Sequence, residues 1–66
     1  MTFEEIQLDT WYDIAHRVNG RECTQRMQVI RKRDDGNEPW VQCFTLNWEY
    51  VPIIRSNFIG AYEVRS

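Results

Sequence analysis

An Asn-Gly pair at residues 19–20 constrains this chain more than any other feature. It lies between two segments, TWYDIAHRV and RECTQRMQV, in which apolar and polar residues alternate. Asn-Gly is the pair that most readily adopts the two positive φ angles of a two-residue type I′ turn. The sequence therefore predicts a hairpin in which a strand over residues 10–18 pairs with a strand over about 22–32.

This turn also sets the register of the hairpin, because it places Val18 opposite Arg21 and the pairing continues to Tyr12 opposite Met27. One face of the two strands then carries mainly apolar side chains: Tyr12, Ile14, His16, Val18, Cys23 and Met27. The other face carries two pairs of opposite charge: Asp13 with Arg26, and Arg17 with Glu22. This division is the pattern of a half-buried antiparallel sheet.

A second turn is predicted in the segment DDGNEP, centred on Asp35-Gly36, before a third strand over WVQCFTLNW, residues 40–48. A tight turn there sets Met27 opposite Phe44. The expected core is then Tyr12, Ile14, Met27, Phe44 and Leu46. The segments VPII (51–54) and FIGAYEV (58–64) indicate a fourth and a fifth strand.

A short helix is predicted at the start of the chain. Thr2 and Glu5 have the spacing of a capping box, in which a hydroxyl and a carboxylate bind the first free amides of a helix. The helix is expected to run to about Leu8, with Phe3 and Ile6 three residues apart on one face.

A length of 66 residues allows one small domain, residues 1–66, which buries roughly 60% of the surface of its unfolded chain. The predicted fold is mostly β: a small, strongly bent antiparallel sheet or an SH3-like or Sm-like barrel of about five strands, with a short N-terminal helix.

The predicted register also gathers apolar residues on the face away from the core: Trp11, Ile30, Val41 and Cys43. In one interpretation the N-terminal helix covers this patch. In the other, the patch contacts a partner or a second copy of the chain, because exposed contiguous apolar surface marks interaction sites. Three further aromatic residues are candidates for the same partner-binding surface: Trp40, Trp48 and Tyr50.

A formal charge of −2 disfavours general binding to nucleic acid, which depends on clustered Lys and Arg. The basic run RKR is followed at once by Asp34 and Asp35. No apolar segment is long enough for a membrane span, and the start MTFEEIQLD is acidic, unlike a signal peptide, so a cytoplasmic location is expected.

Little in the sequence indicates catalysis, so we expect neither an enzyme nor a cofactor. The only histidine, His16, falls on the apolar face opposite Cys23, where a buried structural imidazole is the expected role. Two cysteines and one histidine at these spacings match no zinc site. Cys23 and Cys43 are predicted on opposite faces, so no disulfide is expected and Cys43 is expected to be the more reactive thiol.

The segment from Trp40 to Val64 resembles the closing part of WYL domains, in which a strand with aromatic and Cys positions precedes an Arg-bearing strand and an Ile-centred final strand. Cys43, Arg55 and Ile59 occupy the corresponding positions, whereas Trp40-Val41-Gln42 replaces the Trp-Tyr-Leu triplet. The resemblance implies a regulatory domain that binds a nucleotide-like ligand through Arg55.

The function that these observations favour is a small interaction or regulatory protein, an inhibitor or adaptor such as phages and other mobile elements encode. It would act as a monomer or homodimer and bind a protein partner through an aromatic and acidic surface. The alternative is a binder of single-stranded nucleic acid or nucleotides, in which aromatic rings stack on bases. In that alternative the phosphates are held by four cations: Arg31, Lys32, Arg33 and Arg55.

Overall fold

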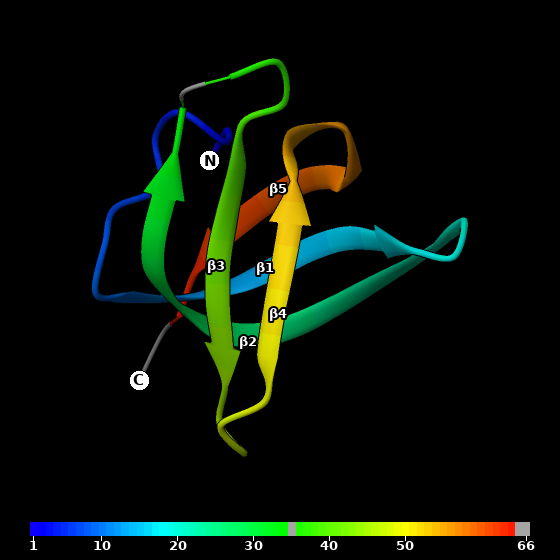
Figure 1. The fold of residues 1–66 in the computed structure, drawn as a ribbon. Coiled ribbons are helices and arrows are strands. Elements are labelled where there is room, and N and C mark those ends of the chain that lie inside the picture. Colours follow the sequence, from blue (N-terminus) through cyan, green and yellow to red (C-terminus); the bar gives the residue numbers. More distant parts are fainter. Residues whose placement is uncertain (35, 65–66) are drawn as a thin grey trace.

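Five antiparallel strands form one sheet in the computed structural model, which describes residues 1–34 and 36–64 (Figure 1). The strands are β1 (Thr10–Val18), β2 (Arg21–Arg33), β3 (Trp40–Thr45), β4 (Tyr50–Ile54) and β5 (Phe58–Glu63). A short 3₁₀ turn, η1 (Arg55–Asn57), joins β4 to β5. The order across the sheet is β4-β3-β2-β1-β5, so the chain forms a meander whose last strand returns to the edge beside β1. The prediction of a mostly β chain with five strands is confirmed.

The β1–β2 hairpin has the predicted register along its whole length, from Val18 opposite Arg21 to Tyr12 opposite Met27. Its turn residues have the expected positive φ angles, 52° at Asn19 and 79° at Gly20. The far end of this hairpin projects away from the rest of the sheet (Figure 1). The local turn signal was sufficient here because a two-residue loop leaves no freedom in the pairing.

The predicted pairing of β2 with β3 is wrong. Met27 lies opposite Thr45 and not opposite Phe44, and beyond Val29 the register shifts by one further residue. The shift leaves Ile30 as the extra residue of a β-bulge. Residues 34–39 separate the two strands, so the connection is longer than the predicted two-residue turn, of which Asp35 lies outside the described residues.

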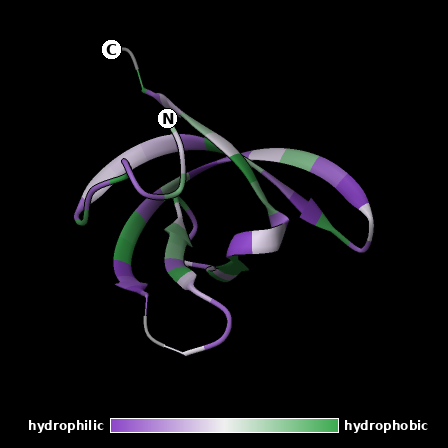
Figure 2. Cartoon of the chain, turned by 90° about the horizontal axis from the view of Figure 1, so that it is seen from above, coloured by the Kyte–Doolittle hydropathy of each residue, from purple (hydrophilic) through white to green (hydrophobic). Residues whose placement is uncertain are grey.

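A slip of one residue exchanges the two faces of a strand, because side chains alternate with a period of two. The inner face of β3 therefore presents Val41 and Cys43, which are fully buried, and its outer face presents Trp40, Gln42 and Phe44. Leu46, predicted in the core, is 65% exposed just beyond the strand. Figure 2 shows the resulting alternation of hydrophobic and hydrophilic residues along the strands.

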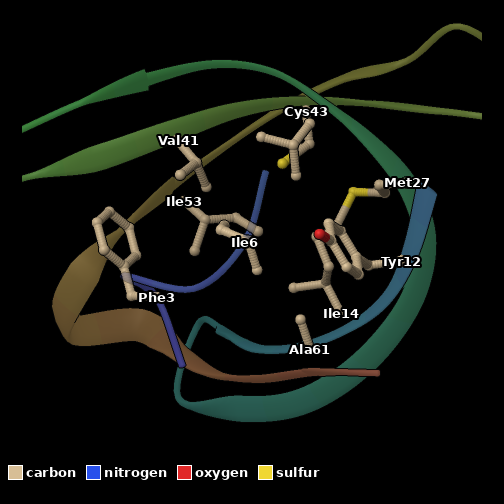
Figure 3. Packing of buried hydrophobic residues seen from close by; sticks show 10 residues of the cluster. Phe3, Ile6, Tyr12, Ile14, Met27, Val41, Cys43, Ile53 and Ala61 are labelled. Carbon is tan, nitrogen blue, oxygen red and sulfur yellow. The ribbon is translucent and has the colours of Figure 1, made fainter. Parts of the chain in front are cut away.

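The core lies inside the curve of the bent sheet (Figure 3). Its members come from every strand and from the N-terminal segment: Phe3, Ile6, Tyr12, Ile14, Met27, Val29, Val41, Cys43, Ile53 and Ala61. Most of them are small or aliphatic, and the large rings of the third and fourth strands are left outside. Tyr12 keeps its polar end satisfied, because its hydroxyl accepts a hydrogen bond of 3.0 Å from the Gln7 amide.

No α-helix occurs among residues 1–34 and 36–64, so the predicted N-terminal helix is wrong. Half of the capping box is present, since the Thr2 amide donates to the Glu5 carboxylate at 2.9 Å and lowers its pKa. The chain makes only one turn there, because Phe3 and Ile6 enter the core and two of the carbonyl groups bond to a side chain instead of a following amide. Lys32 donates to the carbonyl of Glu4 at 3.0 Å and to that of Ile6 at 3.5 Å.

The two edge strands are protected in different ways. On β5, Met1 exchanges two backbone hydrogen bonds with Ala61, of 2.7 and 3.1 Å, and so covers part of the edge. On β4, Pro52 stands in the middle of the strand. The β3 pairing leaves its nitrogen on the free edge, where a missing N–H costs no ladder hydrogen bond and discourages pairing with another strand.

Candidate interaction surface

The outer side of the sheet carries several aromatic residues. The ladder aligns Trp11 with Gln28, Gln28 with Phe44, and Phe44 with Tyr50, so one row crosses β1 to β4. The Phe44 and Tyr50 rings are 5.5 Å apart between centroids and tilted by 51°. We use the term aromatic face for the outer-side residues of β3 and β4: Trp40, Gln42, Phe44, Tyr50, Pro52 and Ile54.

Several of these side chains are exposed although they are apolar. Tyr50 is 47% exposed and Ile54 is 40% exposed, while Trp40 and Phe44 are half-buried against their neighbours. Exposed apolar residues occurring singly are ordinary, but a contiguous group on one face is characteristic of an interaction surface. Two of the predicted partner-binding residues, Trp40 and Tyr50, lie on this face, and Trp48 lies in the loop that joins its two strands.

The loop between β3 and β4 presents Leu46 and Trp48, which are 65% and 79% exposed. This tip is held in place by Thr45. The Thr45 hydroxyl accepts from the amides of Asn47 and Glu49, at 3.2 and 3.1 Å, and its carbonyl accepts from the Trp48 amide at 3.0 Å. The Thr45 amide in turn donates to the Glu49 carbonyl at 3.0 Å. The two exposed side chains thus stand on a loop with a defined backbone.

Trp48 has a φ angle of +64°, in the left-handed region. A bulky side chain is rarely found there, since its Cβ crowds the following carbonyl at a cost of roughly 1–2 kcal/mol. Trp48 also gains little from burial, because most of its surface faces solvent. It is therefore a residue whose conformation costs free energy and whose side chain contributes little to the fold.

Four cations were predicted as candidates for binding phosphates, and the structure divides them into two pairs. Arg31 lies opposite Gln42 and Arg33 lies opposite Trp40, so both belong to the outer side beside the aromatic face. Lys32 points the other way, binds the N-terminal carbonyls and stands 5.2 Å from the centre of the Phe3 ring. Arg55 forms an ion pair with Glu4 and lies 5.9 Å from the same ring.

The predicted apolar patch of the outer face does not form. Val41 and Cys43 are completely buried on the inner face, so they cannot contact a partner. Ile30 remains 38% exposed because the bulge turns it outward, and Trp11 is half-buried in the row that leads to Phe44. Burial also raises the pKa of the Cys43 thiol to about 12, which reverses the expectation that it would be the more reactive cysteine.

Three acidic side chains, Glu4, Glu5 and Asp13, are bound away from the aromatic face. Glu4 pairs with Arg55, and Glu5 binds the Thr2 amide within the N-terminal turn. Asp13 pairs with Arg26 at 3.0 Å, and this neighbour lowers the pKa of the Asp13 carboxyl. Among the described residues, Arg31 and Arg33 lie beside the aromatic face, and the exposed Glu49 lies next to Trp48 in the β3–β4 loop, so charges of both signs border this face.

Phe44, Leu46 and Ile54 belong to the surface but were missed: Phe44 and Leu46 were assigned to the core, and Ile54 was assigned to neither side. In the sequence WVQCFT, Trp40 and Phe44 alternate with Val41 and Cys43, so hydrophobicity alone does not decide which of the two sets faces the core. Side-chain volume could have distinguished the core residues from the surface residues. A sheet bent around a core supplied by 66 residues has room for Val, Cys and Ala in its centre, which leaves Trp and Phe for the outer side.

A second group of polar residues lies on the inner side of the projecting hairpin. His16 is 2% exposed, and its Nε2 is 2.8 Å from the Gln25 Oε1 and 3.4 Å from the Cys23 Sγ. An open groove of about 590 Å³ runs beside this group and reaches Val18 and Val51. Either ring nitrogen of His16 can carry the proton, so Nε2 can be the donor or the acceptor in these two contacts.

No group of three or more His, Cys, Asp or Glu side chains in the described part of the chain could hold a metal ion. Within residues 1–34 and 36–64, no helix has the length and apolar character needed to cross a membrane. Comparisons with protein-family models, curated proteins and solved structures gave no match.

Proposed function

We propose that this chain is a small non-enzymatic interaction protein, an inhibitor or adaptor that binds a protein partner through the aromatic face and the Leu46–Trp48 tip. The observation that carries the proposal is Trp48: it is 79% exposed, has a φ angle of +64° and stands on a loop fastened to Thr45. Strained residues that the surrounding structure holds in place are concentrated at functional sites. An ordered loop also lowers the entropy lost on binding.

The composition of the surface supports the same function. Trp, Tyr and Arg are the residue types most enriched at the energetic centres of protein interfaces, and this surface has all three. From Trp40 to Leu46 the strand spans about 20 Å at roughly 3.3 Å per residue, a length that suits an interface of ordinary size. Pro52 on the β4 edge disfavours strand addition there, so side chains and not the backbone would form the contact.

The strand order and the strong bend of the sheet support the finer assignment of the fold to SH3-like or Sm-like small barrels. Both cysteines are free thiols in the structure, which supports a cytoplasmic location. The ligand-binding role that the WYL resemblance gives to Arg55 would require this side chain to leave Glu4 and the Phe3 ring.

A second candidate function is the binding of single-stranded nucleic acid. The observation that favours it is the position of Arg31 and Arg33 on the same side of the sheet as Trp40, an arrangement in which bases could stack while phosphates meet the arginines. Two such cations are few for a phosphate backbone, and the net charge of −2 opposes it.

Site-specific photo-crosslinking in the native cells would test the proposal. A photoreactive amino acid replaces Trp48, and a control variant carries it at Thr24, which is also exposed, on the β1–β2 hairpin. We expect a protein adduct that forms from position 48, does not form from position 24 and survives nuclease. An adduct that nuclease removes would favour the second candidate. Absence of any adduct specific to position 48 would contradict both.

A further inference from the structure

This inference rests on the proposed function and concerns the chemistry of the partner. We propose that the partner is an acidic protein that presents an apolar pocket to Trp48 and, roughly 13–20 Å away along β3, a cluster of carboxylates to Arg31 and Arg33. The pocket and the cluster would together fix the direction in which the partner lies along the β3–β4 hairpin.

The two arginines carry this inference because the fold does not use their charge. The ion pairs among the described residues are Arg26 with Asp13 and Arg55 with Glu4, and neither involves Arg31 or Arg33. Both arginines are exposed, and each faces a neutral residue across the ladder, Gln42 or Trp40. Arginine beside an aromatic ring is suited to bidentate contact with carboxylates at an interface.

The neighbours of the arginines favour a protein over a nucleic acid. Aliphatic side chains interrupt the aromatic face: Ile30 and Ile54 are exposed near the arginines, and Leu46 is exposed at the tip. These side chains offer no flat ring for a base, whereas an apolar protein surface buries them well. Tyr50 also packs against Phe44, with the two ring planes tilted by 51°, so these two rings do not offer one flat platform for bases.

A second copy of this chain is also disfavoured as the occupant. The usual two-fold dimer apposes the same surface from both subunits. Such a contact across the aromatic face would bring Arg31 and Arg33 of one copy toward those of the other, and the repulsion of like charges opposes it. Three of the acidic side chains, Asp13, Glu4 and Glu5, are already bound by Arg26, Arg55 and the Thr2 amide and are not free to balance this charge.

The test uses the protein captured by crosslinking at position 48, purified, as the probe in surface plasmon resonance against the whole chain. The variants are Arg31→Gln/Arg33→Gln, the charge-preserving Arg31→Lys/Arg33→Lys, and the matched control Arg17→Gln/Arg21→Gln. The control removes the same charge from exposed positions at the far end of the β1–β2 hairpin. A further variant, Trp48→Gly, tests the contribution of the tip. A (dT)20 oligonucleotide tests binding of nucleic acid, and size-exclusion chromatography of the chain alone tests self-association.

We expect the Gln variant to associate roughly ten-fold more slowly at low salt and to lose most of the salt dependence that the wild type shows. The Lys variant should keep most of the rate, and the control should match the wild type. If the Gln variant binds like the control and salt has no effect, the acidic partner is disproved, while loss of binding by Trp48→Gly would leave the proposed function intact.

The remaining outcomes contradict the proposed function itself. Tight, Arg31-dependent binding of (dT)20 would identify the surface as a nucleic-acid site. A dimer that dissociates on Trp48→Gly would identify the chain's own copy as the occupant. Capture of no protein at position 48, or equal binding by Trp48→Gly and the wild type, would contradict both the binding role of Trp48 and the proposed acidic partner.

Discussion

Val41 and Gln42 are neighbours in β3 and lie on opposite sides of the sheet: Val41 is completely buried against the core, and Gln42 faces outward opposite Arg31. The bulge at Ile30 and the longer loop before β3 produce this arrangement, and the tight turn predicted from the sequence would have reversed it. The identity of every residue on the candidate interaction surface depends on it.

The two neighbours therefore give a direct test of the register. Val41→Glu should prevent folding, because a carboxylate would be buried without a partner in a domain that has little stability to lose. Gln42→Glu should change the free energy of unfolding by less than about 1 kcal/mol, since the new charge faces Arg31 in water. Urea denaturation followed by circular dichroism measures both. Similar midpoints for the two variants would show that the faces are assigned wrongly.

The hydroxyl of Thr45 should matter more than an ordinary surface hydroxyl. It accepts from two loop amides, so Thr45→Ala should lower the free energy of unfolding by about 1–2 kcal/mol, as loss of a helix N-cap does. Thr24→Ala, at an exposed position, is the matched control and should stay within about 0.5 kcal/mol of wild type. Equal stability of the two variants would mean that the loop is not fastened through Thr45.

The two thiols should differ in reactivity. Cys43 is fully buried with a pKa raised to about 12, so it stays a protonated thiol at pH 8, whereas Cys23 is half-buried beside an open groove. We expect iodoacetamide at pH 8 to modify Cys23 first in the native protein and Cys43 only at the rate of unfolding. Mass spectrometry of tryptic peptides over time measures this order, and early labelling of Cys43 would contradict the core.

The ion pair of Asp13 with Arg26 should be visible in the pH dependence of stability. The pair lowers the pKa of Asp13 in the folded state, so its stabilising contribution is present above the unfolded pKa of about 3.9 and is lost as the pH falls through the folded value. Asp13→Asn should therefore have less change in melting temperature than wild type in the acid range below about pH 4. Identical acid profiles would show that the pair contributes nothing.

The parts of the fold that were predictable from sequence are those that local chemistry determines. Asn19 and Gly20 set the β1–β2 register without help from the rest of the chain. The bulge at Ile30 has no such local signal, because it is fixed by the packing of Val29 and Val41 against the same core. The one extra residue of the bulge, which the sequence did not predict, was enough to move Phe44 from the predicted core to the surface.

The prediction of an N-terminal helix was wrong for a related reason. Thr2 and Glu5 make one of the two expected capping contacts, and Phe3 and Ile6 are buried together as their spacing suggested. The sequence pattern does not indicate that Lys32 binds two carbonyl groups of this segment, in place of the backbone amides of a helix. Of the candidate surface, Trp40, Trp48 and Tyr50 were predicted as partner-binding residues, whereas the position of Trp40 beside Arg33 required the observed register.

The substitution Trp48→Gly is the most direct test of the central claim, which is that the tip exists for binding and not for folding. Glycine adopts a φ of +64° without strain, so the free energy of unfolding should stay unchanged or rise by up to about 1 kcal/mol. Binding to the protein captured at position 48 should be lost in the same sample. A loss of stability of more than about 1 kcal/mol, or binding equal to wild type, would contradict the claim.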